Sequence, residues 1–319
     1  MLNLDSIEAA QQRIRTYVKR TPLVRSRTLS EMLGTNLYLK LEIFQTTGAF
    51  KVRGAFNKIL SELDKARKSG VVAVSGGNHA QAVAYAGKVL GCQTIILTLK
   101  STPRNYIDAT RGYGAEVFQF ENITQAFEKV SEYEREGMLF VHPFDDPLVM
   151  AGQGTLGLEM LEDVPDLTDV FVSIGGGGLM SGVAVALRSQ KNIRIRGVET
   201  EGADAMARAL EAGHPVEIHP TSIAKTLGAP SVSDRTLALA KEHLKTITIV
   251  SDREAMQALE LLLERVKVLT EPAASCTLAA AMRLKEHFGP ENHVALILCG
   301  GNLGMEQLCE YHAAFSKSR

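Results

Sequence analysis

The chain has 319 residues, of which 45% are hydrophobic and 22% are charged, and its formal net charge is −1. This composition is typical of a soluble protein with a substantial core and a length that suits roughly two domains. The near-neutral charge and the lack of tryptophan argue against a nucleic-acid surface. The longest apolar stretch, residues 170–187, contains four consecutive glycines, which argues against a membrane span. We therefore expect neither nucleic acid nor a membrane as a partner.

The first half of the chain alternates apolar runs with amphipathic segments. A surface helix is predicted within residues 1–20, which lack the apolar core of a signal peptide. Residues 36–41 indicate a strand, and residues 51–68 carry a helical repeat of apolar side chains. Further strands are predicted over residues 71–74, 92–99, 115–120 and 138–141, with helices over 80–90, 103–113 and 124–136. This alternation predicts a parallel α/β layer.

The pattern restarts near residue 148. Helices are predicted over residues 153–161, 179–188, 202–213 and 273–288, and strands over 169–174, 193–199, 246–250 and 293–298. Residues 214–230 form a loop-rich region. Ser251 and Glu254 have the spacing of a capping box at the start of another helix. The four cysteines have neither Cys-x-x-Cys nor zinc-finger spacing, which indicates reduced thiols and a cytoplasmic protein.

Lys51 stands between a polar, glycine-bearing loop and the start of a predicted helix. The positive end of the helix dipole disfavours a charged ammonium there and lowers its pKa. A neutral amine is the form that attacks a carbonyl in Schiff-base chemistry. Taken by itself, the stretch favours a solvated lysine at a helix start, and the other segments of the chain reverse that preference.

Three glycine-rich turns link a buried strand to a helix, at residues 74–80, 174–179 and 298–303. In parallel sheets such turns lie at the carboxyl ends of the strands, where ligands bind. Gly175 to Gly178 predict a phosphate site, because glycines let backbone N–H groups approach an anion at a helix start. The run matches neither a P-loop nor the dinucleotide fingerprint, since Ser181 occupies the third glycine position. The alternative for this run is a turn that binds no ligand. For the turn at residues 74–80 the alternative is a helix cap, and for the turn at residues 298–303 it is a small thiol in the core.

Taken together, these segments resemble the serine/threonine dehydratase family of pyridoxal-phosphate enzymes, the fold-type II group that includes serine racemase. The resemblance runs in order along nearly the whole chain. It is carried by residues 47–55, 75–81, 151–155, 175–179, 271–272 and 299–302. It implies two parallel-sheet α/β domains with the cofactor in the cleft between them. The large domain would comprise residues 1–60 and 146–319, and residues 61–145 would form a small mobile domain.

The resemblance also implies roles for individual residues. Lys51 would hold pyridoxal phosphate as a Schiff base and later remove the substrate α-proton. Phe50 would pack beside the ring, Asn78 would bond the ring hydroxyl, and Cys299 would face the pyridine nitrogen. The phosphate would lie on Gly175, Gly176, Gly177, Gly178 and Leu179, and the substrate carboxylate on the loop that contains Ser75, Gly77, Asn78 and His79.

Cys299 has a chemical consequence in this scheme. A thiol is a weak and neutral partner, so the pyridine nitrogen would stay unprotonated and the ring would be a poorer electron sink. Prompt loss of a β-leaving group is then favoured over transamination.

The sequence departs from the family pattern at a few positions. Gly76 replaces the serine that racemases carry, so racemisation should be weak. The family's cation site would use Glu199 and the carbonyl of Ala203, but its third ligand position is Ala205. Binding of a mono- or divalent cation is therefore left open. The chain ends soon after the last motif, so we expect no C-terminal regulatory domain.

The expected function is an ammonia-lyase that converts L-threonine, L-serine or both to a 2-oxo acid and ammonia. The resemblance further implies a homodimer in amino-acid catabolism. Alternatives are a dehydratase of 3-hydroxyaspartate or phenylserine, a serine racemase-like enzyme, a β-replacement synthase, and a silent binder of an amino acid or cofactor.

Overall fold

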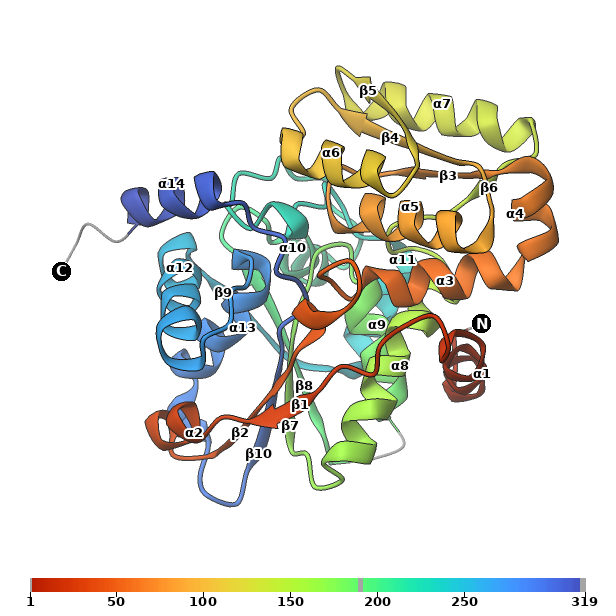
Figure 1. The fold of residues 1–319 in the computed structure, drawn as a ribbon. Coiled ribbons are helices and arrows are strands. Elements are labelled where there is room, and N and C mark those ends of the chain that lie inside the picture. Colours follow the sequence, from red (N-terminus) through yellow and green to blue (C-terminus); the bar gives the residue numbers. More distant parts are fainter. Residues whose placement is uncertain (1, 189–191, 316–319) are drawn as a thin grey trace.

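The computed structural model describes residues 2–188 and 192–315, which form two β-sheets flanked by helices (Figure 1). The strands of this part are β1 Leu23–Arg25, β2 Asn36–Lys40, β3 Val71–Val74, β4 Thr94–Leu99, β5 Glu116–Phe120, β6 Leu139–Phe140, β7 Asp169–Ser173, β8 Arg194–Thr200, β9 Leu244–Val250 and β10 His293–Ile297. Its α-helices are α1 Leu4–Ile14, α2 Arg27–Leu33, α3 Lys51–Ser61, α4 Leu63–Ser69, α5 Asn78–Leu90, α6 Arg104–Gly112, α7 Ile123–Arg135, α8 Pro147–Asp163, α9 Gly178–Leu187, α10 Ala205–Ala212, α11 Asp234–His243, α12 Asp252–Leu261, α13 Pro272–Arg283 and α14 Met305–Phe315. Shorter helical turns cover Glu42–Phe44, Lys225–Leu227, Leu262–Val266 and Lys285–His287.

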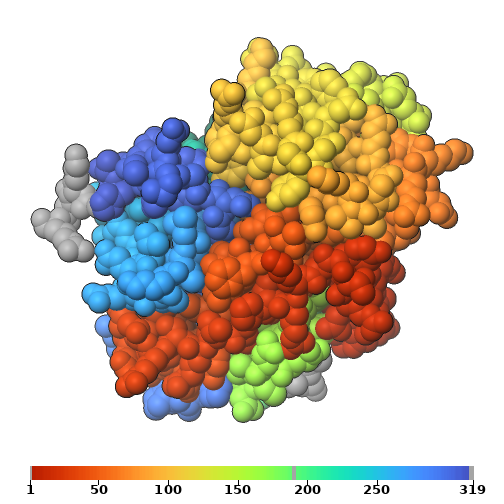
Figure 2. Space-filling view, viewed as in Figure 1, coloured from red at the N-terminus to blue at the C-terminus, as the bar shows by residue number. Residues whose placement is uncertain are grey.

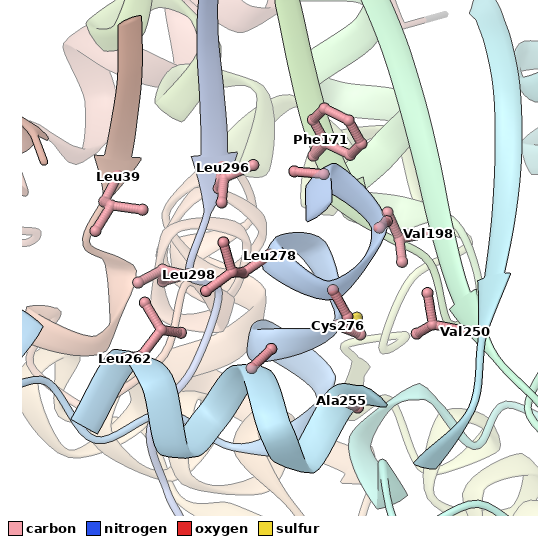
Figure 3. Packing of buried hydrophobic residues seen from close by; sticks show 14 of the residues in the cluster. Leu39, Phe171, Val198, Val250, Ala255, Leu262, Cys276, Leu278, Leu296 and Leu298 are labelled. Carbon is pink, nitrogen blue, oxygen red and sulfur yellow. The ribbon is translucent and has the colours of Figure 1, made fainter. Parts of the chain in front are cut away.

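The larger sheet has the strand order β1-β2-β10-β7-β8-β9. Its strands are parallel except for β1, which pairs antiparallel with β2. The central strands β7 and β10 are almost wholly buried, as expected for parallel strands with helices on both faces. Helices α12 and α13 cover one face, and α8 and α9 cover the other (Figure 1). Figure 3 shows the first of these layers, where Leu39, Phe171 and Leu296 of the strands face Leu278 of α13.

The smaller sheet has the order β5-β4-β3-β6, and all its neighbouring strands are parallel. Its central strand β3 is a short and fully buried run rich in β-branched valine, which suits a sheet covered by helices. Helices α5 and α7 pack against it, and its residues form one lobe of the molecule (Figure 2). Helix α3 joins the lobes, because it packs against both α5 and α8. The predicted α/β fold with two largely parallel sheets is confirmed.

Some elements differ from the sequence predictions. The helix predicted over residues 51–68 is broken at Glu62, whose backbone leaves the helical region (φ −131°, ψ 38°). The two halves have different partners, since α3 packs against α5 and α8 whereas α4 packs against β6. Strand β1 and helices α2 and α11 had no predicted counterpart. In the described ranges, no helix is both long and apolar enough to cross a membrane.

Candidate active site

The three glycine-rich turns meet where the two sheets face each other. Strands β7 and β10 are neighbours in the larger sheet, so their carboxyl ends bring Ser173 to within 3.4 Å of the Cys299 thiol. The turn after β3 reaches the same place, because the Asn78 side chain accepts a hydrogen bond of 2.8 Å from Asn302. The loop before α3 is attached there by an isolated bridge between Ala49 and Gly300. The structure therefore brings these turns and the loop before Lys51 to one region, while the predicted cation residues Glu199 and Ala203 lie on β8 and in the turn after it.

Lys51 is the first residue of α3, as the sequence predicts. Its Nζ donates a 2.6 Å hydrogen bond to the carbonyl of Pro143 and lies 5.2 Å from the centre of the Phe50 ring. Burial lowers the pKa of Lys51 to about 8, against the opposing influence of Cys299 and Glu271. The direction agrees with the sequence prediction, but burial is the main cause. A substantial fraction of this amine is neutral near physiological pH, which suits attack on a carbonyl.

The glycine run leads into α9, which begins at Gly178. A β-carbon on Gly176 would collide with the ring of Phe144, and one on Gly178 would lie 2.9 Å from the Phe144 backbone. Gly177 has φ +94°, a conformation that side chains disfavour. The first N–H groups of a helix have no intrahelical acceptor, so this turn presents donors to an anion. The turn and the Lys51 amine thus fit a phosphate-bearing aldehyde such as pyridoxal phosphate.

Replacing Gly177 by alanine is expected to lower both stability and phosphate binding. The left-handed backbone alone costs an alanine about 1–2 kcal/mol, and its β-carbon would lie only 2.8 Å from that of Thr236. Gly213 provides a matched control, because it has φ +83° and no atom within 4 Å of an added β-carbon. Urea unfolding should show a loss of stability in both variants. Titration with pyridoxal phosphate should show weaker binding in Gly177→Ala and wild-type binding in Gly213→Ala. Equal affinity for the cofactor in the two variants would contradict the phosphate role.

The loop that contains Ser75 and Gly77 precedes α5. The hydroxyl of Ser75 accepts a hydrogen bond of 3.1 Å from the Gly77 N–H, and Asn78 is the first residue of the helix. A side chain at Gly76 would collide with Thr102 and lie 2.9 Å from the hydroxyl of Thr98. The packing of this loop is therefore built around glycine at position 76.

His79 is buried, and its Nε2 is 2.8 Å from the carbonyl of Val141. That contact requires the proton on Nε2, while Nδ1 has no partner among the described residues. Burial lowers the pKa of His79 to about 3, with smaller effects of neighbouring charges. The ring is thus a neutral link between α5 and the residue that follows β6.

Stability should fall on mild acidification because of His79. The unfolded histidine binds a proton near pH 6.5 and the folded one only near pH 3, so its contribution is present above pH 6.5 and is lost as the pH falls. Between pH 7 and pH 5 the loss amounts to about 2 kcal/mol at roughly 1.4 kcal/mol per unit. The stability gap between wild type and His79→Gln, measured by urea unfolding, should narrow by this amount. An unchanged gap would contradict the neutral, buried ring.

Cys299 follows β10 and is buried. Burial raises the pKa of its thiol to about 12, with Glu271 acting in the same direction and Ser173 against it. The thiol is therefore neutral at physiological pH, as the sequence argument for an unprotonated pyridine nitrogen requires.

Glu199, the predicted carboxylate ligand of a cation, has other partners in this structure. The carboxylate of Glu199 accepts the N–H groups of Met206 and Ala207, at 2.9 and 2.8 Å, at the start of α10. Burial raises the pKa of Glu199 to about 8. Ala203 lies in the turn after β8, and Ala205 has no ligating side chain. Among the residues that the structure describes, no group of three or more His, Cys, Asp and Glu side chains could hold a metal ion.

Several site residues had no assigned role in the sequence analysis. Pro143 supplies the acceptor for Lys51, and Phe144 covers the glycine run. Glu271 and Asn302 hold the Asn78 side chain. Glu271 and Asn302 lie in motifs that carried the family resemblance, which was the available signal. Residues 143 and 144 only follow a predicted strand, so the local sequence pattern did not indicate that they belong to the site.

Comparison with known proteins agrees with this geometry. The family model described as "Pyridoxal-phosphate dependent enzyme" matches residues 14–300. L-threonine ammonia-lyase of Thermotoga maritima is 40% identical over 313 residues, which cover 97% of this chain and 77% of that protein. L-threo-3-hydroxyaspartate ammonia-lyase of Saccharomyces cerevisiae is 38% identical over 302 residues, with 93% and 92% covered. The crystal structure of serine racemase from Dictyostelium discoideum has a TM-score of 0.88 at 34% identity and covers 95% of this chain and 99% of that one.

Proposed function

The chain belongs to the family of pyridoxal-phosphate dependent enzymes, and from that premise we propose that it is a carbon–oxygen lyase of the threonine/serine ammonia-lyase type. It converts L-threonine, L-serine or both into the corresponding 2-oxo acid and ammonia by β-elimination. The observation that carries the proposal is the partly buried Lys51 amine, with its pKa lowered to about 8, in one cluster with the neutral Cys299 thiol. This pair suits covalent attachment of the cofactor and elimination from a ring whose nitrogen is unprotonated.

The residues of the site fit the cofactor in defined roles. When bound, pyridoxal phosphate supplies a carbonyl for the amines of Lys51 and substrate, and a conjugated ring that takes up electron density from the substrate α-carbon. Its phosphate would be held by the N–H groups of the turn before and at the start of α9. Its ring would lie beside Phe50, with Asn78 at the ring hydroxyl and Cys299 at the pyridine nitrogen. The phosphate donors are Gly175, Gly176, Gly177, Gly178 and Leu179.

Lys51 and the loop before α5 would do the work on the substrate. Ser75, Gly77, Asn78 and His79 lie on the loop that would bind the carboxylate, where backbone N–H groups at a helix start favour an anion. The amine of Lys51, free after the substrate has replaced it, accepts the α-proton as a general base. The β-hydroxyl then leaves as water together with the proton that Lys51 has taken up, and the released enamine reacts with water to give 2-oxo acid and ammonia. Gly76 offers no acid or base on the opposite face, so elimination is favoured over racemisation.

A 2-oxo acid release assay tests the proposal directly. The holoenzyme should release 2-oxo acid from L-threonine or L-serine, and Lys51→Ala should release none. Absence of 2-oxo acid from stereoisomers of serine, threonine, 3-hydroxyaspartate and phenylserine would contradict the lyase function. Formation of a thioether on addition of a thiol would favour a β-replacement synthase.

A second candidate is the same elimination on 3-hydroxyaspartate. It is favoured by Lys225, which lines a small cavity together with Thr226 and Glu271 and could pair with a second carboxylate. The yeast relative is named for that substrate. Release of 2-oxo acid from 3-hydroxyaspartate, with none from serine or threonine, would decide for this candidate.

We also propose the remaining features that the family resemblance implies. These are a homodimer, a cytoplasmic location, a place in amino-acid catabolism, and a small domain of residues 61–145 that moves against residues 1–60 and 146–319. The strands of the smaller sheet all lie within residues 61–145, which supports this division. Glu199 and the Ala203 carbonyl are the proposed ligands of a mono- or divalent cation. Light scattering, and activity with and without a chelator or added cations, test the dimer and the cation.

A further inference from the structure

Glu271 is a buried acid that the proposed reaction does not use. It immediately precedes α13 and is only 3% exposed. Its Oε1 accepts hydrogen bonds from the Asn78 amide at 2.7 Å and from the Thr226 hydroxyl at 3.1 Å. Its Oε2 is buried and has no partner among the residues that the structure describes. A buried carboxyl oxygen without a partner is costly, which indicates a function for this group rather than a packing role.

The contacts of Asn78 show what Glu271 does. The Asn78 amide donates one N–H to Glu271, and its Oδ1 accepts from the Asn302 amide at 2.8 Å. Asn302 is itself anchored, because it also donates to the carbonyl of Thr47 at 2.7 Å. If the Asn78 amide turned over, its oxygen would face the carboxyl oxygen and its NH₂ would face the NH₂ of Asn302. Glu271 and Asn302 thus determine the orientation of the amide and leave its second N–H available.

The surroundings of Glu271 contain few charges. Lys51, Cys299 and Tyr106 are the titratable groups that influence it or are influenced by it. The Lys51 amine donates to Pro143, and the Cys299 thiol is neutral. Burial raises the pKa of Glu271 to about 7, although its bonds to Asn78 and Thr226 and the charge of Lys51 act against this. An uncharged Glu271 in turn favours the free base of Lys51, because it removes a negative charge that would stabilise the ammonium.

We propose that Glu271 is a positioning residue of the site, which holds the Asn78 amide so that its free N–H contacts the bound cofactor. The contact joins α13, on the larger sheet, to α5, on the smaller sheet, across 193 residues of sequence. The inference rests on the proposed function, since it assigns Glu271 to the cofactor site of the lyase. It adds to that function a residue that acts through Asn78 and not on the substrate.

Two substitutions distinguish a role of Glu271 in positioning Asn78 from a role in packing alone. Glu271→Gln keeps an oxygen acceptor for Asn78 and Thr226 and has the shape of the uncharged acid. Glu271→Ala removes the acceptor and leaves the amide free to turn. Ser275→Ala is the matched control, because Ser275 is buried on the same helix and donates to Ala255 at 2.7 Å, away from Asn78. All three variants lose or alter a buried hydrogen bond near the start of α13, but only the first two act on Asn78.

The readouts are the dissociation constant for pyridoxal phosphate and the pH at which the absorption band of the bound cofactor titrates. Loss of an outer residue that orients a ligand-binding group weakens binding by about 10–100-fold, and we expect this for Glu271→Ala together with a shifted titration. Glu271→Gln should stay within about threefold of wild type, since its acceptor is retained. Ser275→Ala should bind the cofactor as wild type does. If Glu271→Ala does not fold, Asn302→Ala removes the restraint on the other side of the amide and should weaken binding similarly.

The contrary outcomes are distinct. Wild-type affinity and titration in Glu271→Ala, or in Asn302→Ala where the former does not fold, would overturn the inference. So would a loss in Glu271→Gln as large as in Glu271→Ala, or an equal loss in Ser275→Ala. A wild-type protein that binds no pyridoxal phosphate would contradict the proposed function itself.

Discussion

Replacement of Lys51 by alanine is expected to abolish the visible absorption band of covalently bound pyridoxal phosphate and to lower lyase activity by about 10⁴-fold or more. The amine has two successive roles, since it binds the cofactor covalently and then removes the α-proton. The groups that contact Lys51 or influence its charge in the described structure include Phe50, Pro143, Glu271 and Cys299, and none of these is a second amine. Absorption spectra and 2-oxo acid release measure the two roles separately.

Lys58 provides the matched control for this experiment. It lies two turns further along α3 and is also largely buried, but its Nζ pairs with Glu62 at 2.6 Å and Asp146 at 3.0 Å. Lys58→Ala should retain the absorption band and most of the activity, at the expense of some stability. A band that persists in Lys51→Ala, or that disappears in Lys58→Ala as well, would show that the cofactor is attached elsewhere.

Replacement of Arg53 by alanine is expected to lower the free energy of unfolding by about 3–5 kcal/mol, because it leaves buried carboxylates without their cation. The Arg53 side chain is fully buried and forms paired hydrogen bonds with Glu42, at 2.8 and 2.9 Å, and with Glu159, at 2.7 and 2.9 Å. Lys40 completes the cluster with a bond of 2.6 Å to Glu159. The two positive charges of this cluster neutralise its two negative charges, and removal of Arg53 leaves one carboxylate charge without compensation.

The electrostatics of this cluster support a large effect. Burial alone would raise the pKa of Glu42, but the charge and hydrogen bonds of Arg53 hold it below its usual range. Arg27 is a suitable control, since its pair with Glu31 is of the surface i,i+4 type and its side chain is 90% exposed. Arg27→Ala should cost no more than about 0.5 kcal/mol. Urea unfolding of both variants tests the contrast, and a similar small loss in each would contradict a stabilising buried cluster.

Arg53 also helps to position the active-site lysine, because it lies two residues after Lys51 on α3. Its bonds to Glu42, in the loop before α3, and to Glu159 of α8 fix the first turn of the helix that carries the lysine. In the sequence Arg53 is simply a charged residue in an amphipathic helix. Its burial depends on partners 11 and 106 residues away, which no local pattern indicates.

The predictions that succeeded rest on local chemistry. Val71–Val74 is a buried β-branched run and became a central strand of the smaller sheet, since such residues pack well between helices. The glycine run became a turn with a positive φ at Gly177, which a non-glycine residue adopts only with strain. The prediction that residues 51–68 form one helix was wrong. Helical periodicity continued through Glu62, but α3 and α4 pack on different partners and the backbone turns between them.

The sequence by itself determined the α/β class, the glycine-rich turns and the place of Lys51 at a helix start, because each depends on residues that are neighbours in the chain. It also carried the motifs by which the family is identified. The tertiary structure alone decided which groups surround that lysine: the Pro143 carbonyl, the Phe144 ring over the glycines, and the Glu271 carboxyl that holds Asn78. These contacts join segments that the parallel sheets bring together from distant parts of the chain. They set burial and hydrogen bonding, and burial is the main cause of the lowered pKa of Lys51.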